Sequence, residues 1–420
     1  MAHFDPSKPI DDPEVWFPKG MFIDNNAQQL TIKVYDADDE NKTFILNQKQ
    51  MVALSRFLWT GKLLPTDRNA YIKTLGLTTT KEITDKVWKE IDALIKTYSE
   101  ISKDCTQFKD VTWDKLVDLS GNIKTYATIA GGTSSSSYYQ AMLEWVGQYN
   151  DEKAKNNPDQ KTLDELSSAI KAAIEEEQKK IQGIQDHIKE ALTELNTFHD
   201  NCKGYESTLN DDGETLAALL KEEGNDVEHL KSQISEELKE IEDLQSQIDA
   251  DHQKIKESAY YVWIPFIGTI AGVTVTLIAE ADIKQLKESM QRIQALLDEN
   301  EEKLQTAYRL QGDITSMGKQ VQGLVDVMKP AIETLEALQG AWSVMNQDLK
   351  ALYDLFEDDK QAIPPMLLEK PQLETIVNSW NDLKAYATDY IEHAFMTNDP
   401  EDVSIQEYVD QLDNEVNRLA

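Results

Sequence analysis

The sequence predicts an all-α protein, an elongated bundle of long antiparallel helices with a coiled-coil hairpin that carries a hydrophobic head at its tip. Three observations support this fold class. Apolar residues recur at three- and four-residue steps over most of the 420 residues. The interruptions are short and rich in glycine, proline and asparagine, as helix ends are. Only one segment, Leu30–Tyr35, alternates between apolar and polar residues like a strand.

The beginning of the chain differs from the rest. Its prolines and its acidic run, Asp36–Glu40, predict an arm laid over the body. A helix is predicted from Asn47 to Trp59. Gly61 and Pro65 end that helix, and a second short helix begins near Asp67.

Long helices follow. The first is predicted over Thr80–Ile129 and ends at a glycine- and serine-rich turn. A short helix, Tyr138–Tyr149, and an Asn-Asn-Pro loop lead to another long helix, which Thr162 and Glu165 open as a capping box. We expect that helix to end at Asn210–Gly213.

A pair of heptad-like stretches then surrounds one apolar segment. The first stretch begins at Glu214 and the second ends near Leu324. Two arms of similar length predict an antiparallel helical hairpin with the apolar segment at its tip. Pro330 is expected to interrupt the helix that follows. The remaining predicted helices run from Leu335 to Phe356, from Leu373 to Phe395 and from Ser404 to Leu419.

The apolar segment is Ala259–Ala279, AYYVWIPFIGTIAGVTVTLIA, with no charged residue between Glu257 and Glu280. Its length is near that of a membrane-spanning helix. Proline in a helix interior costs roughly 3 kcal/mol. Pro265 therefore predicts a turn between Ile264 and Gly268, with a short and a longer arm on either side.

Three interpretations of this segment are considered: buried core, a permanent membrane anchor, or a membrane-binding surface that stays hidden until needed. A hairpin tip is far from any wide core, which favours a binding surface. The broken tract and the acidic arms on both sides disfavour a permanent anchor, and the leading aromatic rings favour a membrane–water boundary. The residues predicted to contact a membrane are Tyr260, Tyr261, Val262, Trp263, Ile264, Pro265, Phe266, Ile267, Gly268, Ile270, Gly272, Val273, Val275, Leu277 and Ile278.

These elements divide the chain into four parts. Residues 1–42 are the N-terminal arm, and residues 43–257 are the tail bundle with the ascending arm of the hairpin. Residues 258–280 are the head, and residues 281–420 are the descending arm with the C-terminal bundle helices. Each arm would reach roughly 50 to 70 Å at 1.5 Å per residue.

The formal net charge of −34 restricts the partners. Nucleic acid is not expected, because its phosphates need Lys and Arg, and a basic patch for anionic lipid is not expected either. If the protein meets a membrane, apolar surface must make the contact. The first residues lack the basic and apolar regions of a signal peptide, so we expect a cytosolic protein or release by another route.

Cys105 and Cys202 match no metal or redox spacing. If their helices fold back on each other around the loop after the first long helix, Cys105 lies about 25 Å from Cys202 at 1.5 Å per residue. This geometry disfavours a disulfide and leaves the pairing open.

No catalytic motif is present, and neither a phosphate loop nor a dinucleotide fingerprint is found. Asp226 with His229, and Asp249 with His252, resemble the ligand pairs of di-iron bundles. Both pairs are predicted on one helix and not on two facing helices, which favours an exposed polar face. We therefore expect no enzyme, no metal site and no cofactor.

Three features together resemble the α-helical pore-forming toxins of the cytolysin A superfamily. The first is TFILNQKQMVALSRFLWTGKLLPTDRNAYIKTLGL, residues 43–77. The second is the apolar head between two long helices. The third is LQGAWSVMNQDLKAL, Leu338–Leu352, with Trp342 near its start. The likeness is greatest to the xenorhabdolysin A-type component of binary toxins and to related helical insecticidal crystal toxins.

The resemblance implies a soluble monomer that docks on a target-cell lipid membrane, rearranges and self-oligomerises. Binary members need a second toxin component, whereas the crystal-toxin relatives act alone, and the sequence leaves both possibilities open. The alternative from a different class is a non-enzymatic coiled-coil scaffold or adaptor with an apolar protein-docking tip.

Overall fold

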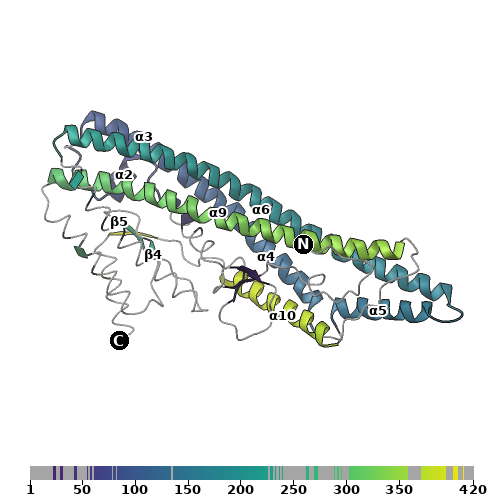
Figure 1. The fold of residues 1–420 in the computed structure, drawn as a ribbon. Coiled ribbons are helices and arrows are strands. Elements are labelled where there is room, and N and C mark those ends of the chain that lie inside the picture. Colours follow the sequence, from purple (N-terminus) through teal and green to yellow (C-terminus); the bar gives the residue numbers. More distant parts are fainter. Residues whose placement is uncertain are drawn as a thin grey trace. The chain divides into compact units, whose positions relative to one another are not determined.

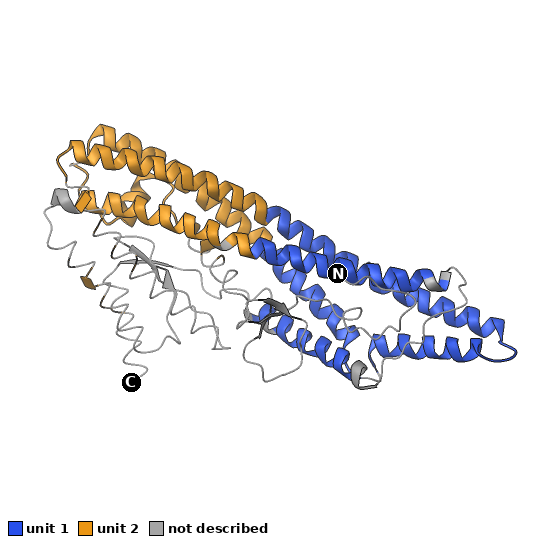
Figure 2. Ribbon diagram, viewed as in Figure 1, with its two compact units in different colours: residues 1–48, 113–194, 331–394 blue, residues 49–112, 195–330, 395–420 orange. Residues whose placement is uncertain are grey.

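The structure is a computed structural model. It describes residues 61–225 with gaps at 78, 82 and 134–135, residues 302–357 and 370–393, six short strands and isolated positions elsewhere. The chain forms two compact units (Figures 1 and 2). Unit 1 comprises Met1–Gln48, Trp113–Glu194 and Ala331–Ala394, and unit 2 comprises Lys49–Thr112, Leu195–Pro330 and Phe395–Ala420.

The all-α prediction is confirmed. Every described element longer than a few residues is a helix, and two helices, α6 (Gln160–Glu222) and α9 (Glu302–Glu357), are 63 and 56 residues long. The strands are short, and apart from the one overlapping Leu30–Tyr35 they were not predicted. The compact units cut across α6 and α9, whereas the predicted four-part division follows the order of the elements. That division remains a prediction, since its boundaries around the head lie outside the described residues.

Unit 1 has an aromatic core. It contains α4 (Trp113–Ala130), α5 (Tyr138–Lys153), α10 (Lys370–His393) and parts of α6 and α9. Tyr126 of α4 contacts Trp342 of α9 edge to face, with ring centroids 5.4 Å apart, and Trp380 of α10 at 5.0 Å. Such pairs contribute about 0.5–1.5 kcal/mol beyond area burial. The predicted late helix around Trp342 is thus part of the core.

A small sheet also belongs to unit 1. Its central strand, β1 (Phe22–Asp24), pairs antiparallel with β2 (Gln29–Thr31) and with β3 (Lys42–Phe44). Phe22 lies opposite Thr31 on one side and opposite Phe44 on the other. The predicted strand Leu30–Tyr35 overlaps β2 at Leu30 and Thr31, and its later residues lie outside the described part of the chain.

Unit 2 begins with the two short helical segments that the sequence predicted. Leu54, Phe57 and Leu58 are helical and buried. In α2 (Arg68–Thr74), the side chain of Asp67 accepts hydrogen bonds from the first backbone amides, as a helix cap does. The predicted start near Asp67 is therefore confirmed.

The predicted helix over residues 80–129 is confirmed from Asp85 onward, with one irregularity. It consists of α3 (Asp85–Gln107), a π-helical segment (Phe108–Thr112) and α4. The side chain of Thr84 accepts a hydrogen bond from the amide of Val87 at the start of α3. π-Helical turns often mark functional sites or strain, and here Phe108 is buried against Phe198, with ring centroids 4.9 Å apart.

Two predictions about α6 are wrong. The helix begins at Gln160, and its cap is Asp159, whose carboxylate accepts from the amide of Lys161 and from the hydroxyl of Thr162. Thr162 itself lies inside the helix and does not open it. The Asn-Asp-Asp-Gly stretch from Asn210 does not end the helix either.

The continuation of α6 follows from burial on both sides of that stretch. Leu209 and Leu216 are each 1% exposed. Burying a leucine contributes about 1.5–3 kcal/mol, which exceeds the roughly 1 kcal/mol helix penalty of Gly213. Packing between distant segments therefore outweighs local propensity.

The predicted interruption at Pro330 is wrong for a similar reason. Pro330 lies inside α9, and the neighbouring Met328 and Ala331 are fully buried. The predicted helix Leu373–Phe395 corresponds to α10, with slightly earlier ends. Of the predicted terminal helix, Ser404 belongs to a strand, Asp410 is helical, and the rest lies outside the described residues.

The two cysteines lie nearer each other than predicted. Both thiols are free and buried, and the carboxylate of Asp104, beside Cys105, accepts hydrogen bonds from Asn201 and Tyr205, on either side of Cys202. The predicted distance placed the chain reversal in the middle of residues 131–157, although a short helix was predicted within that range. Instead α5 is a 16-residue helix that continues the chain before α6 turns back, so the register between α3 and α6 shifts.

Candidate functional site

The apolar segment contains a β-hairpin. β4 (Val262–Trp263) pairs antiparallel with β5 (Thr269–Gly272), and Val262 lies opposite Gly272. The turn predicted between Ile264 and Gly268 lies outside the described residues.

A third strand covers the other edge of β5. β6 (Glu401–Ser404) pairs antiparallel with β5 along its whole length, beginning with Thr269 opposite Ser404. β5 is therefore the central strand of the sheet, with backbone partners on both sides. Sequence reasoning missed β6 because Glu401 and Asp402 are poor strand formers and because pairing with a distant segment leaves no local signal.

The structure brings part of the predicted membrane-contacting set into this sheet, namely Val262, Trp263, Ile270 and Gly272. Their contact with a membrane stays a prediction. The other members lie outside the described residues: Tyr260, Tyr261, Ile264, Pro265, Phe266, Ile267, Gly268, Val273, Val275, Leu277 and Ile278. Much of the two predicted hairpin arms, within residues 226–257 and 281–301, lies outside them as well.

A second feature of unit 2 is a buried carboxyl group on α9. Asp313 is 1% exposed, and its Oδ2 accepts hydrogen bonds from the hydroxyls of Tyr71 on α2 (2.8 Å) and Tyr98 on α3 (2.9 Å). Its Oδ1 has no hydrogen-bond partner among the described residues. Burial raises the pKa of Asp313 to about 7, although the two tyrosine hydrogen bonds act in the opposite direction.

Unit 2 holds another carboxyl group with a raised pKa. Burial, and next the charge of Glu90 on α3, raise the pKa of Asp212 on α6 to about 6. The charge of Asp212 also contributes to the raised pKa of Tyr98. The carboxyl of Asp313 is thus held by hydroxyl groups of α2 and α3, in a region where further negative charge is unfavourable.

α9 also holds the end of α2. Arg309, one helical turn before Asp313, donates a hydrogen bond from Nη1 to the backbone oxygen of Leu75 (2.6 Å). Leu75 is the C-cap residue of α2, and a cation at a helix C-terminus is favourable. The next residue, Gly76, has φ +61° and lies so close to Arg309 that an added Cβ would approach its Nη1 to 2.8 Å.

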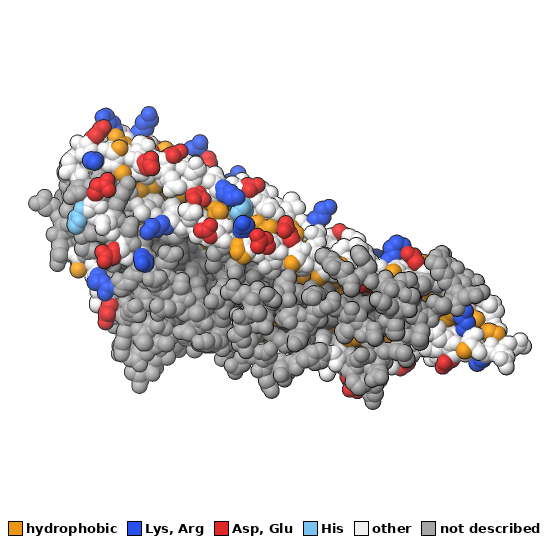
Figure 3. All heavy atoms as spheres, viewed as in Figure 1, with side chains coloured by type: hydrophobic (Ala, Val, Ile, Leu, Met, Phe, Trp, Pro, Cys, Tyr) orange, Lys and Arg blue, Asp and Glu red, His pale blue; other side chains and the backbone are white. Residues whose placement is uncertain are grey.

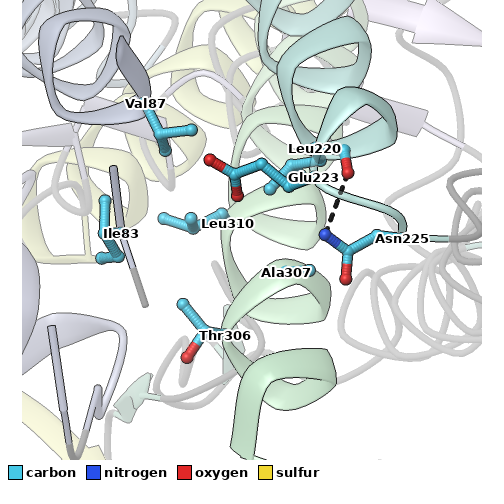
Figure 4. Close-up of a pocket in the computed structure, with 8 residues that line it drawn as sticks. All are labelled: Ile83, Val87, Leu220, Glu223, Asn225, Thr306, Ala307 and Leu310. Carbon is cyan, nitrogen blue, oxygen red and sulfur yellow. Dashed lines mark hydrogen bonds between the residues drawn. The ribbon is translucent and has the colours of Figure 1, made fainter. Parts of the chain in front are cut away.

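A pocket in unit 2 is too small for a ligand (Figure 4). It lies where α3, α6 and α9 meet and has a volume of ≈ 10 Å³, the space of about one water molecule. The side chain of Asn225 turns back to donate to the carbonyl of Leu220 and closes one side. Its lining residues are Ile83, Val87, Leu220, Glu223, Asn225, Thr306, Ala307 and Leu310.

The described surface on the face shown in Figure 3 gives no sign of a charged-ligand site. Acidic and basic side chains are interspersed along the helices on the face shown in Figure 3. Within the described ranges, no group of three or more His, Cys, Asp and Glu side chains could hold a metal ion. Nor does the described part of the chain contain a helix long and apolar enough to cross a membrane.

Comparison with known proteins shows what this fold is similar to. No protein-family model matches the chain, and no curated protein matches it in sequence. Its structure is similar to that of soluble SmhA from Serratia marcescens, a component of the tripartite α-pore-forming toxin Smh. The identity is 11%, the TM-score is 0.51, and the match covers 83% of this chain and 95% of SmhA.

Two further solved structures are similar. Soluble SmhB of the same toxin has 10% identity and a TM-score of 0.51, covering 86% of this chain and 99% of SmhB. XaxA from Xenorhabdus nematophila has 13% identity over 88% of this chain and 98% of its own, but its TM-score of 0.35 is too low to support an argument. The resemblance to helical pore-forming toxins is thereby confirmed at the level of fold.

Proposed function

We propose that this chain is a non-enzymatic pore-forming toxin component. It is soluble before it meets a target-cell membrane, docks there through the apolar head at residues 259–279, rearranges and oligomerises. A second toxin component completes the pore if the chain acts as a member of a set, as SmhA and SmhB do within the tripartite toxin Smh.

One observation carries the proposal. An uncharged apolar segment forms a β-hairpin within a chain whose fold is similar to soluble components of an α-pore-forming toxin. Each large side chain of that segment would gain roughly 1.5–3 kcal/mol on full burial in lipid. With about a dozen such residues, the gross gain is sufficient for docking before the ordering of the chain is subtracted.

The sheet sets the order of events that we propose. A hairpin held on one edge by β6 has to separate from that strand before it can enter a bilayer as a unit. Separation leaves the backbone groups of β5 that faced β6 without partners, and unpaired backbone groups are costly in hydrocarbon. Neighbouring copies in an oligomer would supply partners for that edge, so the head embeds first and assembly follows.

Vesicle leakage tests the proposal. The purified chain is added to phosphatidylcholine vesicles that contain a self-quenching dye. Val273→Asp places a charge in the head and is expected to abolish binding and leakage, whereas the matched Val111→Asp is expected to leave both unchanged. Val111 is a suitable control because it is 44% exposed on the bundle.

The outcomes separate the alternatives. Leakage by the chain alone, or only after a lysate of its source cells is added, supports a pore-forming component. Vesicle binding that Val273→Asp does not weaken refutes the assignment of the head. Neither binding nor leakage, together with specific capture of one protein by the head, supports the scaffold alternative.

A reversible cross-link tests the role of β6. Ala271 and Asp402 are opposite each other in the β5–β6 pair, and facing positions in antiparallel strands have the Cα spacing of a disulfide. The double variant Ala271→Cys/Asp402→Cys is expected to lose leakage when oxidised and to regain it with a reductant. Equal leakage in both redox states would contradict the proposed separation, and either single-cysteine variant is the control.

A further inference from the structure

The short helix α2 depends on tertiary contacts for its position. It has 7 residues, fewer than an isolated helix needs to be stable in water. Two side chains of α9 hold it. Arg309 donates a hydrogen bond to the carbonyl of Leu75, and Asp313 accepts a hydrogen bond from the hydroxyl of Tyr71. Arg309 and Asp313 are four residues apart and therefore share one face of α9.

One of these two contacts involves a group that changes charge near neutral pH. Tyr71 and Asp313 are buried, and both tyrosine hydroxyls donate to the same oxygen of the carboxyl group. A protonated carboxyl is neutral and keeps both hydrogen bonds. An ionised carboxyl places a full charge in the core, and removing that charge from water is energetically unfavourable.

The described groups around Asp313 do not neutralise such a charge. Tyr71 faces it from α2 and Tyr98 faces it from α3. Asp212 of α6, whose charge acts on Tyr98, is hydrogen-bonded to Glu90 of α3 and is itself acidic. The cation on the same face of α9, Arg309, donates to a backbone carbonyl of α2.

We infer that Asp313 is the pH-sensitive part of a clasp that holds α2 on α9, closed when the carboxyl is protonated and loosened when it ionises. Because its pKa is raised to about 7, Asp313 ionises near neutral pH. Asp212, with a pKa of about 6, also gains a negative charge as the pH rises. The ionisation of this buried group thus sets how readily α2 opens away from α9.

The clasp has a consequence that rests on the proposed function. If rearrangement on a membrane requires α2 to leave α9, then alkaline conditions favour conversion and mildly acidic conditions preserve the soluble form. The clasp itself is a property of the soluble chain and can be measured without any membrane.

Hydrogen exchange of the full chain tests the clasp. Protection of residues 68–77, corrected for the intrinsic exchange rate, is compared at pH 6 and pH 8. With a folded pKa of about 7 and an unfolded value of 3.8, protection in the wild type should fall about tenfold. Asp313→Asn should keep the pH 6 level at both pH values, because the amide cannot ionise.

Two further variants complete the test. Asp326→Asn removes an exposed carboxylate of the same helix and should behave as wild type. Tyr71→Phe removes one hydrogen bond to the carboxylate while keeping the ring, so it should loosen α2 at both pH values, even if Asp313→Asn fails to fold. Equal protection of α2 at pH 6 and pH 8 in the wild type, or no loss of protection in Tyr71→Phe, would overturn the clasp.

The same samples separate the clasp from the proposed function. A tenfold change in protection without vesicle leakage at either pH, even after the lysate is added, supports the clasp and counts against a pore-forming role. Leakage with protection that is independent of pH supports the pore-forming role and overturns the clasp. Both effects together, with faster leakage at pH 8 in wild type but not in Asp313→Asn, support both.

Discussion

Replacing Asp313 by Asn should change how the stability of the whole chain depends on pH. An aspartate in an unfolded chain has a pKa near 3.8, and burial raises the folded value to about 7. The folded state therefore binds more protons than the unfolded state between these values, so stability falls as pH rises through this window and is constant above it. Each pKa unit corresponds to about 1.4 kcal/mol.

The expected size follows from these two values. Between pH 5 and pH 8 the wild type should lose about 2.5 kcal/mol of unfolding free energy through Asp313 alone. Asp313→Asn is nearly isosteric, and its side-chain oxygen still accepts hydrogen bonds from the buried hydroxyls of Tyr71 and Tyr98. The variant should lack this loss and should therefore exceed the wild type in stability at pH 8.

The assay is urea unfolding followed by far-ultraviolet circular dichroism at both pH values. Burial also lowers the pKa of His199, so stability from that residue rises with pH, opposite in sign to Asp313. The difference between variant and wild type cancels this contribution. Equal pH dependence in wild type and Asp313→Asn would refute the reasoning, and Asp326→Asn is the surface control.

Three other predictions concern packing, backbone and thiols. Trp342→Ala should lower the unfolding free energy by about 3–5 kcal/mol and Trp342→Phe by less, since the larger cavity forms in the aromatic core of unit 1; equal losses in urea unfolding would contradict this. Gly76→Ala should destabilise the protein by roughly 1–2 kcal/mol because alanine disfavours the left-handed backbone, and further because the added methyl group displaces Arg309. Gly224 has φ +89° and open space around it, so Gly224→Ala should show the backbone contribution alone. Burial raises the pKa of both Cys105 and Cys202, so a thiol reagent should label neither in the folded chain and both in urea; rapid labelling of the folded chain would show that the thiols are accessible.

The sequence by itself determined where most helices lie. The start of α2 at Asp67, the helical stretch from α3 to α4, and the helices α5 and α10 were all predictable. These features depend on side-chain periodicity, on caps and on turn residues, all of which act within a few residues of each other.

Only the tertiary structure determined where a helix continues through residues that locally favour its end. α6 continues through Asn210–Gly213 and α9 through Pro330, because leucines and other apolar residues buried by distant segments outweigh a local penalty. The pairing of β5 with β6 and the enclosure of Asp313 by Tyr71 and Tyr98 join segments that are far apart in the chain. No periodicity records such contacts, because burial and hydrogen bonding between distant residues depend on the register in which the helices and strands pack.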